Sequence, residues 1–100
     1  MLIFNKNNID EVRDFARYLK EYRPRFYKEL QKKGDVISNI RRYMDTLVMK
    51  QMDIRDEIFQ DLMDRIPNGN STMARIQQLN KAEQMAFDTI SKEAYQREIK

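Results

Sequence analysis

Cationic and aromatic side chains alternate in the first half of the chain, a pattern that could bind an anionic ligand. The segments are Arg17-Tyr18, Tyr22-Arg23, Arg25-Phe26-Tyr27-Lys28 and Arg41-Arg42-Tyr43. Clusters of lysine and arginine bind phosphate groups, and exposed aromatic rings stack on unpaired bases. The sequence therefore offers one candidate site for an anion or a nucleic acid, formed by Arg23, Arg25, Lys28, Lys32, Lys33, Arg41 and Arg42.

The same residues have an interpretation that needs no ligand. The rings would then form the edge of a hydrophobic core, and the cations would form a solvated helix surface. The sequence favours this interpretation, because it contains no helix-turn-helix glycine pattern, zinc finger or phosphate-binding loop. If nucleic acid does bind, we expect contacts mainly to phosphate and an affinity that falls as salt rises.

Acidic residues in the second half are spaced so that several share a helix face. They are Asp53, Asp56, Glu57, Asp61 and Asp64. Carboxylates can bind hard cations. An enzyme that uses converging carboxylates is therefore a third functional hypothesis, besides protein interaction and nucleic-acid binding. However, the chain has no histidine and no cysteine, which removes the commonest general base, thiolate ligands and the di-iron pattern of helical bundles. We expect a solvated or ion-paired surface, with no metal, no cofactor and no catalytic residue.

Apolar residues on the longest predicted helix form a stripe wider than one neighbouring helix requires. Its outer members are Val48, Met49, Met52, Phe59 and Met63. Methionine fills irregular gaps in a core, which is the interpretation we favour for most of the seven methionines. The extra width would suit either a helix between two layers or a face that contacts a partner or a second copy. We take these five residues as the candidate association face.

Two prolines and two glycines, at Pro24, Gly34, Pro67 and Gly69, divide the chain into lengths typical of helices. Proline is favoured in the first turn of a helix and glycine just after the last turn. The apolar residues between these positions recur at helical spacing, and the expected helices cover about residues 8–22, 24–33, 35–66 and 72–97. Asn8 and Asp35 are the expected N-caps of the first and third helices.

These elements predict one all-α domain over residues 1–100, a small helical bundle of four helices in about three layers. The central helix, about residues 35–66, would be about 48 Å long. Its heptad repeat lapses at Gln51, which favours a globular bundle over a coiled coil. We expect the first two helices to run beside it as a broken column. Basic residues would then gather at the Gly34 end, and acidic residues, Asp10, Glu11 and Asp14 among them, at the other.

Charge is distributed unevenly. Residues 1–50 hold twelve Lys/Arg and seven Asp/Glu, a net charge of +5, whereas residues 51–100 hold seven and nine, a net charge of −2. No run of eighteen apolar residues is present, so we expect a cytoplasmic protein without membrane contact. The leading functional hypothesis is a non-enzymatic protein–protein interaction module that self-associates and acts as a small adaptor, inhibitor or regulator. The alternative is a nucleic-acid or nucleotide-phosphate binder that uses the basic end.

Overall fold

Four helices make up the computed structural model, which describes residues 1–5, 7–66 and 72–98. They are α1 (Ile9–Tyr22), α2 (Pro24–Lys32), α3 (Val36–Asp64) and α4 (Thr72–Ala94). No strand occurs in these ranges. The all-α class and the long central helix are therefore confirmed, and the helices begin and end within three residues of the expected positions.

Local side-chain chemistry fixes where α1 and α3 begin. The Asn8 side chain accepts hydrogen bonds from the backbone N–H groups of Asp10 and Glu11, at 3.0 and 3.3 Å. Asp35 accepts one from the N–H of Ile37 at 3.2 Å. Gly34 has a φ of 117°, a backbone conformation that favours glycine and that turns the chain between α2 and α3. Both predicted N-caps are confirmed, because each side chain bonds N–H groups that lack a partner inside the helix.

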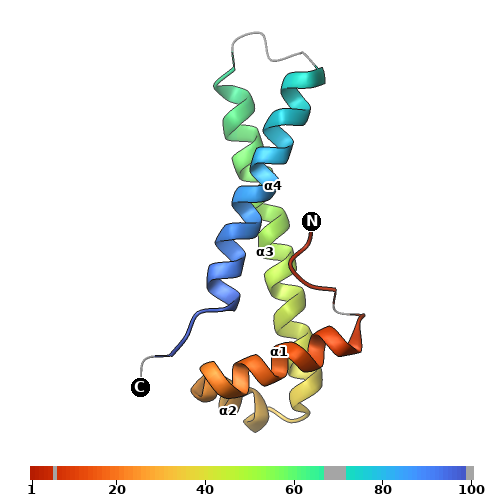
Figure 1. The fold of residues 1–100 in the computed structure, drawn as a ribbon, viewed down its shortest axis with the longest axis vertical. Coiled ribbons are helices and arrows are strands. Elements are labelled where there is room, and N and C mark those ends of the chain that lie inside the picture. The colour runs from red at the N-terminus through yellow and green to blue at the C-terminus, as the bar shows by residue number, and fades with distance from the viewer. Residues whose placement is uncertain (6, 67–71, 99–100) are drawn as a thin grey trace.

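Helices α3 and α4 run antiparallel along the length of the molecule, and α1 and α2 lie across one end of it (Figure 1). The expected column of α1 and α2 beside α3 is therefore wrong. The physical reason lies at Arg23, whose backbone is non-helical (φ −134°, ψ 57°) and redirects the chain just before Pro24. A proline disfavours the helical conformation of the residue before it. The two short helices consequently pack on the first half of α3.

The hydrophobic core lies at this end, which we call the base (α1, α2, residues 36–51 of α3 and residues 82–94 of α4). Its fully buried members include Leu19, Ile40, Met44 and Leu47, from α1 and α3. On α4 the buried residues are Ala82, Ala86, Ile90 and Ala94. Small side chains let two helices approach closely, so the alanines hold α4 against α3 without adding much buried area.

The rest of α3 and α4 projects from the base as a distal hairpin, defined as residues 52–64 and 72–81. The molecule measures 53 × 30 × 19 Å, and its radius of gyration is 16.7 Å. A compact domain of this length has a radius of gyration of about 13 Å. One consequence corrects the predicted charge distribution: Asp10, Glu11 and Asp14 lie on α1 in the base, so they do not join the acidic residues of α3 on the hairpin.

The chain after α4 returns to the base. The Glu98 carboxylate accepts hydrogen bonds from the backbone N–H groups of Arg25 and Phe26, at 2.9 and 3.1 Å, at the start of α2. The Glu98 N–H donates to the carbonyl of Tyr22 at 2.9 Å. These contacts are made by an irregular segment, which explains why α4 ends at Ala94 and not near residue 97.

Candidate functional site

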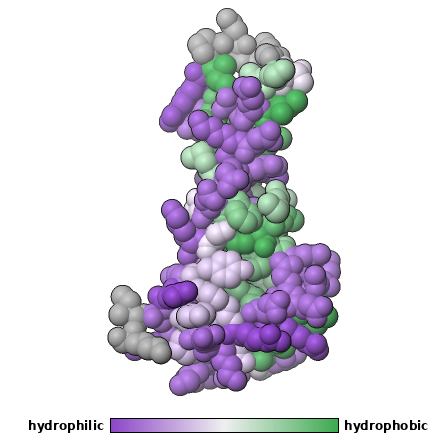
Figure 2. Space-filling view, viewed as in Figure 1, coloured by the Kyte–Doolittle hydropathy of each residue, from purple (hydrophilic) through white to green (hydrophobic). Residues whose placement is uncertain are grey.

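No described residue of the distal hairpin is buried. All fully buried residues of α3 lie between Asn39 and Gln51, and those of α4 begin at Ala82. Two helices alone share a single contact line, so their remaining apolar side chains stay in contact with water. Figure 2 shows apolar side chains at the surface of this narrow part of the molecule, beside hydrophilic ones.

Apolar side chains of both hairpin helices are exposed. On α3, Met52 is 41% exposed, while Phe59 and Met63 are half-buried. On α4, Met73 is 68% and Ile76 54% exposed. Of the other two residues of the candidate association face, Val48 is half-buried and Met49 is 60% exposed. All five predicted residues thus lie in the hairpin or within one helical turn of it: Met52, Phe59 and Met63 are in the hairpin, and Val48 and Met49 directly precede it.

Sequence reasoning missed the contribution of α4. Apolar residues at helical spacing, such as Met73, Ile76 and Leu79, are expected to face the core, yet Leu79 is 38% exposed and the other two more so. One signal was available. Positions on this face carry large side chains in the first half of α4 but alanine at 82, 86 and 94. Small residues allow close contact between helices, so the alanines mark the part of α4 that packs closely against α3. The large side chains mark the part of α4 in the hairpin.

The N-terminal segment crosses the pair of long helices where the hairpin meets the base. The Ile3 N–H donates to Oε1 of Gln51 at 2.8 Å, and Nε2 of Gln51 donates to the Met1 carbonyl at 2.7 Å. Met1 and Leu2 lie over a crevice formed with Met52 of α3 and Glu83 of α4. Met1 and Leu2 are themselves 83% and 51% exposed, so the apolar surface of the hairpin extends onto this segment.

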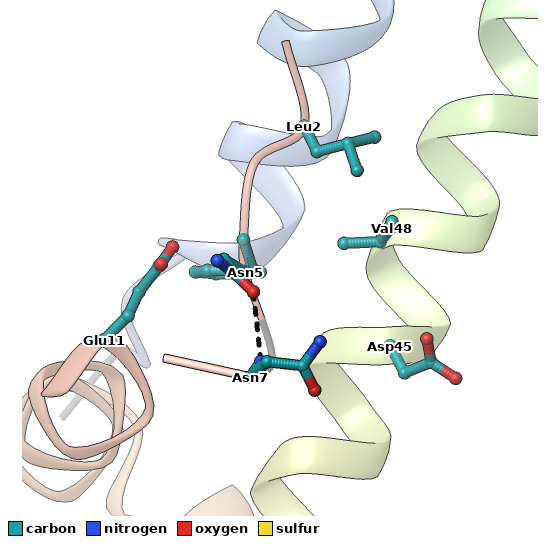
Figure 3. A pocket seen from close by; sticks show the side chains of 7 residues that line it. Leu2, Asn5, Asn7, Glu11, Asp45 and Val48 are labelled. Carbon is teal, nitrogen blue, oxygen red and sulfur yellow. Dashed lines mark hydrogen bonds between the residues drawn. The ribbon is translucent and has the colours of Figure 1, made fainter. Parts of the chain in front are cut away.

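An open pocket of about 500 Å³ lies between the N-terminal segment, the start of α1 and α3. In Figure 3, Leu2 and Val48 face each other on one side, and Asn5, Asn7 and Glu11 lie across the opening. The Asn7 N–H donates to Asn5 Oδ1 at 3.1 Å, which fixes this turn. Amides, carboxylates and apolar side chains line the pocket, without a described cation.

The predicted anion-binding cations do not all share one environment. Six of them are exposed, and we call these the basic surface: Arg25, Lys28, Lys32, Lys33, Arg41 and Arg42. None of the six forms an ion pair with another described residue. Lys33 and Arg42 line a shallow pocket with Phe26 and Tyr43.

Arg23 differs from these six because it is buried. Its Nη1 donates to the Tyr43 hydroxyl at 2.9 Å and to the Ala94 carbonyl at 3.2 Å. Its guanidinium also lies 4.4 Å from the centre of the Phe26 ring. These contacts join α2, α3 and the end of α4, so the Arg23 charge is satisfied within the base.

The carboxylates of the hairpin do not converge. Within residues 1–5, 7–66 and 72–98, no group of three or more Asp or Glu side chains is placed to hold a metal ion. Asp56 and Asp61 pair instead with Arg55 and Arg65, at 3.0 Å each. In the described part of the chain, no helix has the length and apolarity needed to cross a bilayer.

Two groups, Lys50 in the base and Tyr95 just after α4, have shifted pKa values. Partial burial against Phe15 and Tyr18 raises the pKa of Tyr95, and the negative charge of Glu11 adds to the effect. A hydrogen bond of 2.8 Å to Glu93 raises the pKa of Lys50. Burial therefore accounts for most of the Tyr95 shift, and the ion pair with Glu93 accounts for the Lys50 shift.

Comparison with protein-family models, with curated proteins and with solved structures finds no match to this chain.

Proposed function

We propose that the protein is a non-enzymatic interaction module that binds another protein chain through the distal hairpin. The observation that supports this most directly is the absence of any buried residue in the described part of the hairpin, together with the exposure of Met52, Met73 and Ile76. Exposed apolar patches on a small soluble domain mark contact sites, because each apolar group left in water forgoes stabilisation of about 25 cal/mol per Å².

The shape of the hairpin supports the same proposal. Helix-in-groove and helix-bundle interfaces use apolar anchors three and four residues apart on a helix. Positions 59 and 63 of α3 and 73 and 76 of α4 have this spacing, position 52 lies two turns before position 59, and all five are on the part of the helices that projects beyond the base. A partner that covers them would contact the hairpin without disturbing the core, as expected for a small adaptor, inhibitor or regulator.

Site-specific photocrosslinking tests the proposal. A benzophenone amino acid replaces Ile76 on the hairpin, and in a matched control it replaces Lys20, which is exposed on α1. In native cells we expect covalent protein adducts from position 76 and none, or far fewer, from position 20. Equal labelling from both positions, or no adduct from position 76, would contradict the proposal.

The basic surface supports a second candidate function, binding of nucleic acid or of a nucleotide phosphate. The specific observation is that Lys33 and Arg42 line one pocket with two aromatic rings and have no described ion-pair partner. Titration of labelled single-stranded RNA and DNA and of ATP at low salt tests this. We expect binding that weakens steeply with salt and that Arg41→Glu/Arg42→Glu abolishes. No binding at low salt would rule it out.

A further inference from the structure

Three exposed apolar residues of the hairpin, Met52, Met73 and Ile76, lie on one side of the helix pair. The N-terminal segment shows which side, because Met1 lines one crevice with Gln51 and Glu83 and another with Asn80 and Phe87. Residues three or four apart along a helix lie on the same side of it. In the direction away from the base, this side therefore includes Phe59 and Met63 on α3 and Ile76 and Met73 on α4. We call this surface the apolar face, formed by Met1, Leu2, Met52, Phe59, Met63, Met73 and Ile76.

The size of the apolar face suits a stable association. The α3 arm from residue 52 to 64 is about 20 Å long, and two adjacent helices are about 20 Å wide, which gives a flat footprint of about 400 Å². The accessible surface of a ridged helix pair is larger than its footprint. A standard interface buries about 800 Å² of accessible surface on each partner, so one face-to-face contact is of the right order.

The two arms of the hairpin differ in charge. The α3 arm, residues 52–64, carries five Asp/Glu and one Arg, whereas the α4 arm, residues 72–81, carries Arg75 and Lys81 and no acidic residue. A strongly acidic or strongly basic partner would be repelled by one of these arms. A second hairpin of the same sequence matches both, provided that each acidic arm lies against the basic arm of the other copy.

We propose that the partner of the apolar face is a second copy of this chain. The two distal hairpins pack face to face as a four-helix bundle with two-fold symmetry, and the α3 arm of each copy lies against the α4 arm of the other. This inference rests on the proposed function and names its partner. An isologous contact of this kind uses one patch twice, so a single apolar face on each copy is sufficient.

Sedimentation equilibrium on the full chain tests this proposal. A monomer has a mass of 12.2 kDa. We expect the apparent mass to rise towards twice that value with concentration, and Met73→Lys to weaken the dimer at least about tenfold, equal to about 1.4 kcal/mol. Met85→Lys is the matched control, because Met85 is also an exposed methionine of α4, 44% exposed, but points away from the apolar face. Circular dichroism checks that both variants keep their helices.

A charge exchange tests the arrangement of the arms. Asp56→Lys on α3 and Lys81→Glu on α4 should each weaken the dimer, because each places like charges across the interface. The chain that carries both changes should recover at least half of the lost affinity on a logarithmic scale. No recovery, or equal weakening by Met73→Lys and Met85→Lys, would overturn the proposal.

The outcome also separates this inference from the proposed function. A wild-type mass that stays at the monomer value up to about 1 mM, where even weak dimers populate, would overturn the dimer. If position 76 still crosslinks to a different protein in cells, the interaction function stands and only its partner changes. If the protein stays monomeric and position 76 yields no adduct, both proposals fall.

Discussion

Gln51 is a polar side chain at a core position of α3, and its two hydrogen bonds explain why it is tolerated there. It is 4% exposed and lies between Leu47 and Ile54 in the apolar stripe. Its amide accepts from the Ile3 N–H and donates to the Met1 carbonyl. A buried amide without partners costs free energy, whereas this one fastens an extended segment across two helices.

Replacement of Gln51 by alanine should therefore release the N-terminal segment. We expect Gln51→Ala to lower the free energy of unfolding by about 1–3 kcal/mol, because two hydrogen bonds and the packing of a buried side chain are lost. Urea unfolding measures the change, and faster exchange of the Ile3 amide would report release of the segment. Gln60→Ala is the control: Gln60 is exposed and bonds Asp64, one turn away at 2.9 Å, so its loss should change stability by less than about 0.5 kcal/mol.

The raised pKa of Tyr95 predicts how the stability of the fold depends on pH. Because partial burial raises its pKa, the folded protein holds the phenol proton more tightly than the unfolded chain, whose tyrosines titrate near pH 10. The resulting stabilisation is complete below pH 10 and is lost as pH rises through the higher folded pKa. Wild-type stability should thus fall above pH 10, and that of Tyr95→Phe should fall less.

Urea unfolding of both proteins between pH 9 and 11.5 measures this difference. The comparison with Tyr95→Phe is needed because the pKa of Lys50 is also raised, so that loss of its ion pair with Glu93 adds to the alkaline fall in both proteins. Identical pH profiles for the two proteins would contradict the prediction.

At the scale of the elements, the segment after α4 (residues 95–98, called the C-terminal tail) caps α2, a helix distant in sequence. The Arg23 side chain does not cap α2. Instead, two free N–H groups in the first turn of α2 donate to the Glu98 carboxylate. A negative charge at a helix N-terminus is also favoured by the helix dipole. The tail therefore links the end of α4 to the start of α2.

Glu98→Gln should lower the free energy of unfolding by about 1 kcal/mol, because it removes the charge and one of the two carboxylate acceptors. Thermal unfolding followed by circular dichroism measures the effect. Glu21→Gln, an exposed residue of α1, loses the same charge without a helix cap and should leave the melting temperature nearly unchanged. Equal effects of the two substitutions would show that net charge, not capping, is responsible.

The sequence was sufficient to predict the elements, because their limits depend on local chemistry. Asn8, Pro24, Gly34 and Asp35 act on N–H groups or dihedral angles within a few residues, so each could be interpreted without the fold. The end of α4 was not predictable in this way. It depends on Glu98 meeting α2, a contact between residues more than seventy positions apart.

At the scale of the whole molecule, the sequence predicted the width of the apolar stripe on α3 but not what lies beside it. The five residues of the candidate association face were chosen from their spacing. Met49 and Met52 are exposed and the other three are half-buried, and the exposure of the hairpin members follows from how far α3 extends beyond α1 and α2. That distance depends on the crossing of α1 over α3, which helix lengths alone do not determine. The same crossing buried Arg23, whose charge had suggested a ligand site.

The distribution of buried residues predicts that the molecule does not unfold as a uniform unit. The base contains the buried core, whereas the described residues of the hairpin have only partly buried contacts. Amides of the hairpin should therefore exchange through local openings that require at least about 2 kcal/mol less than global unfolding, while those near Leu19 and Met44 report the global value.

Hydrogen exchange with mass spectrometry measures this difference, at a concentration low enough for sedimentation to give the monomer mass. A dimer through the apolar face predicts a second result, because contacts made only by the associated form stabilise the hairpin by mass action. Protection of residues 52–64 and 72–81 should then rise with protein concentration, and that of the base should change much less. Equal protection of hairpin and base at low concentration would contradict this prediction. It would mean that the hairpin, which has no buried core among its described residues, is as stable as the base.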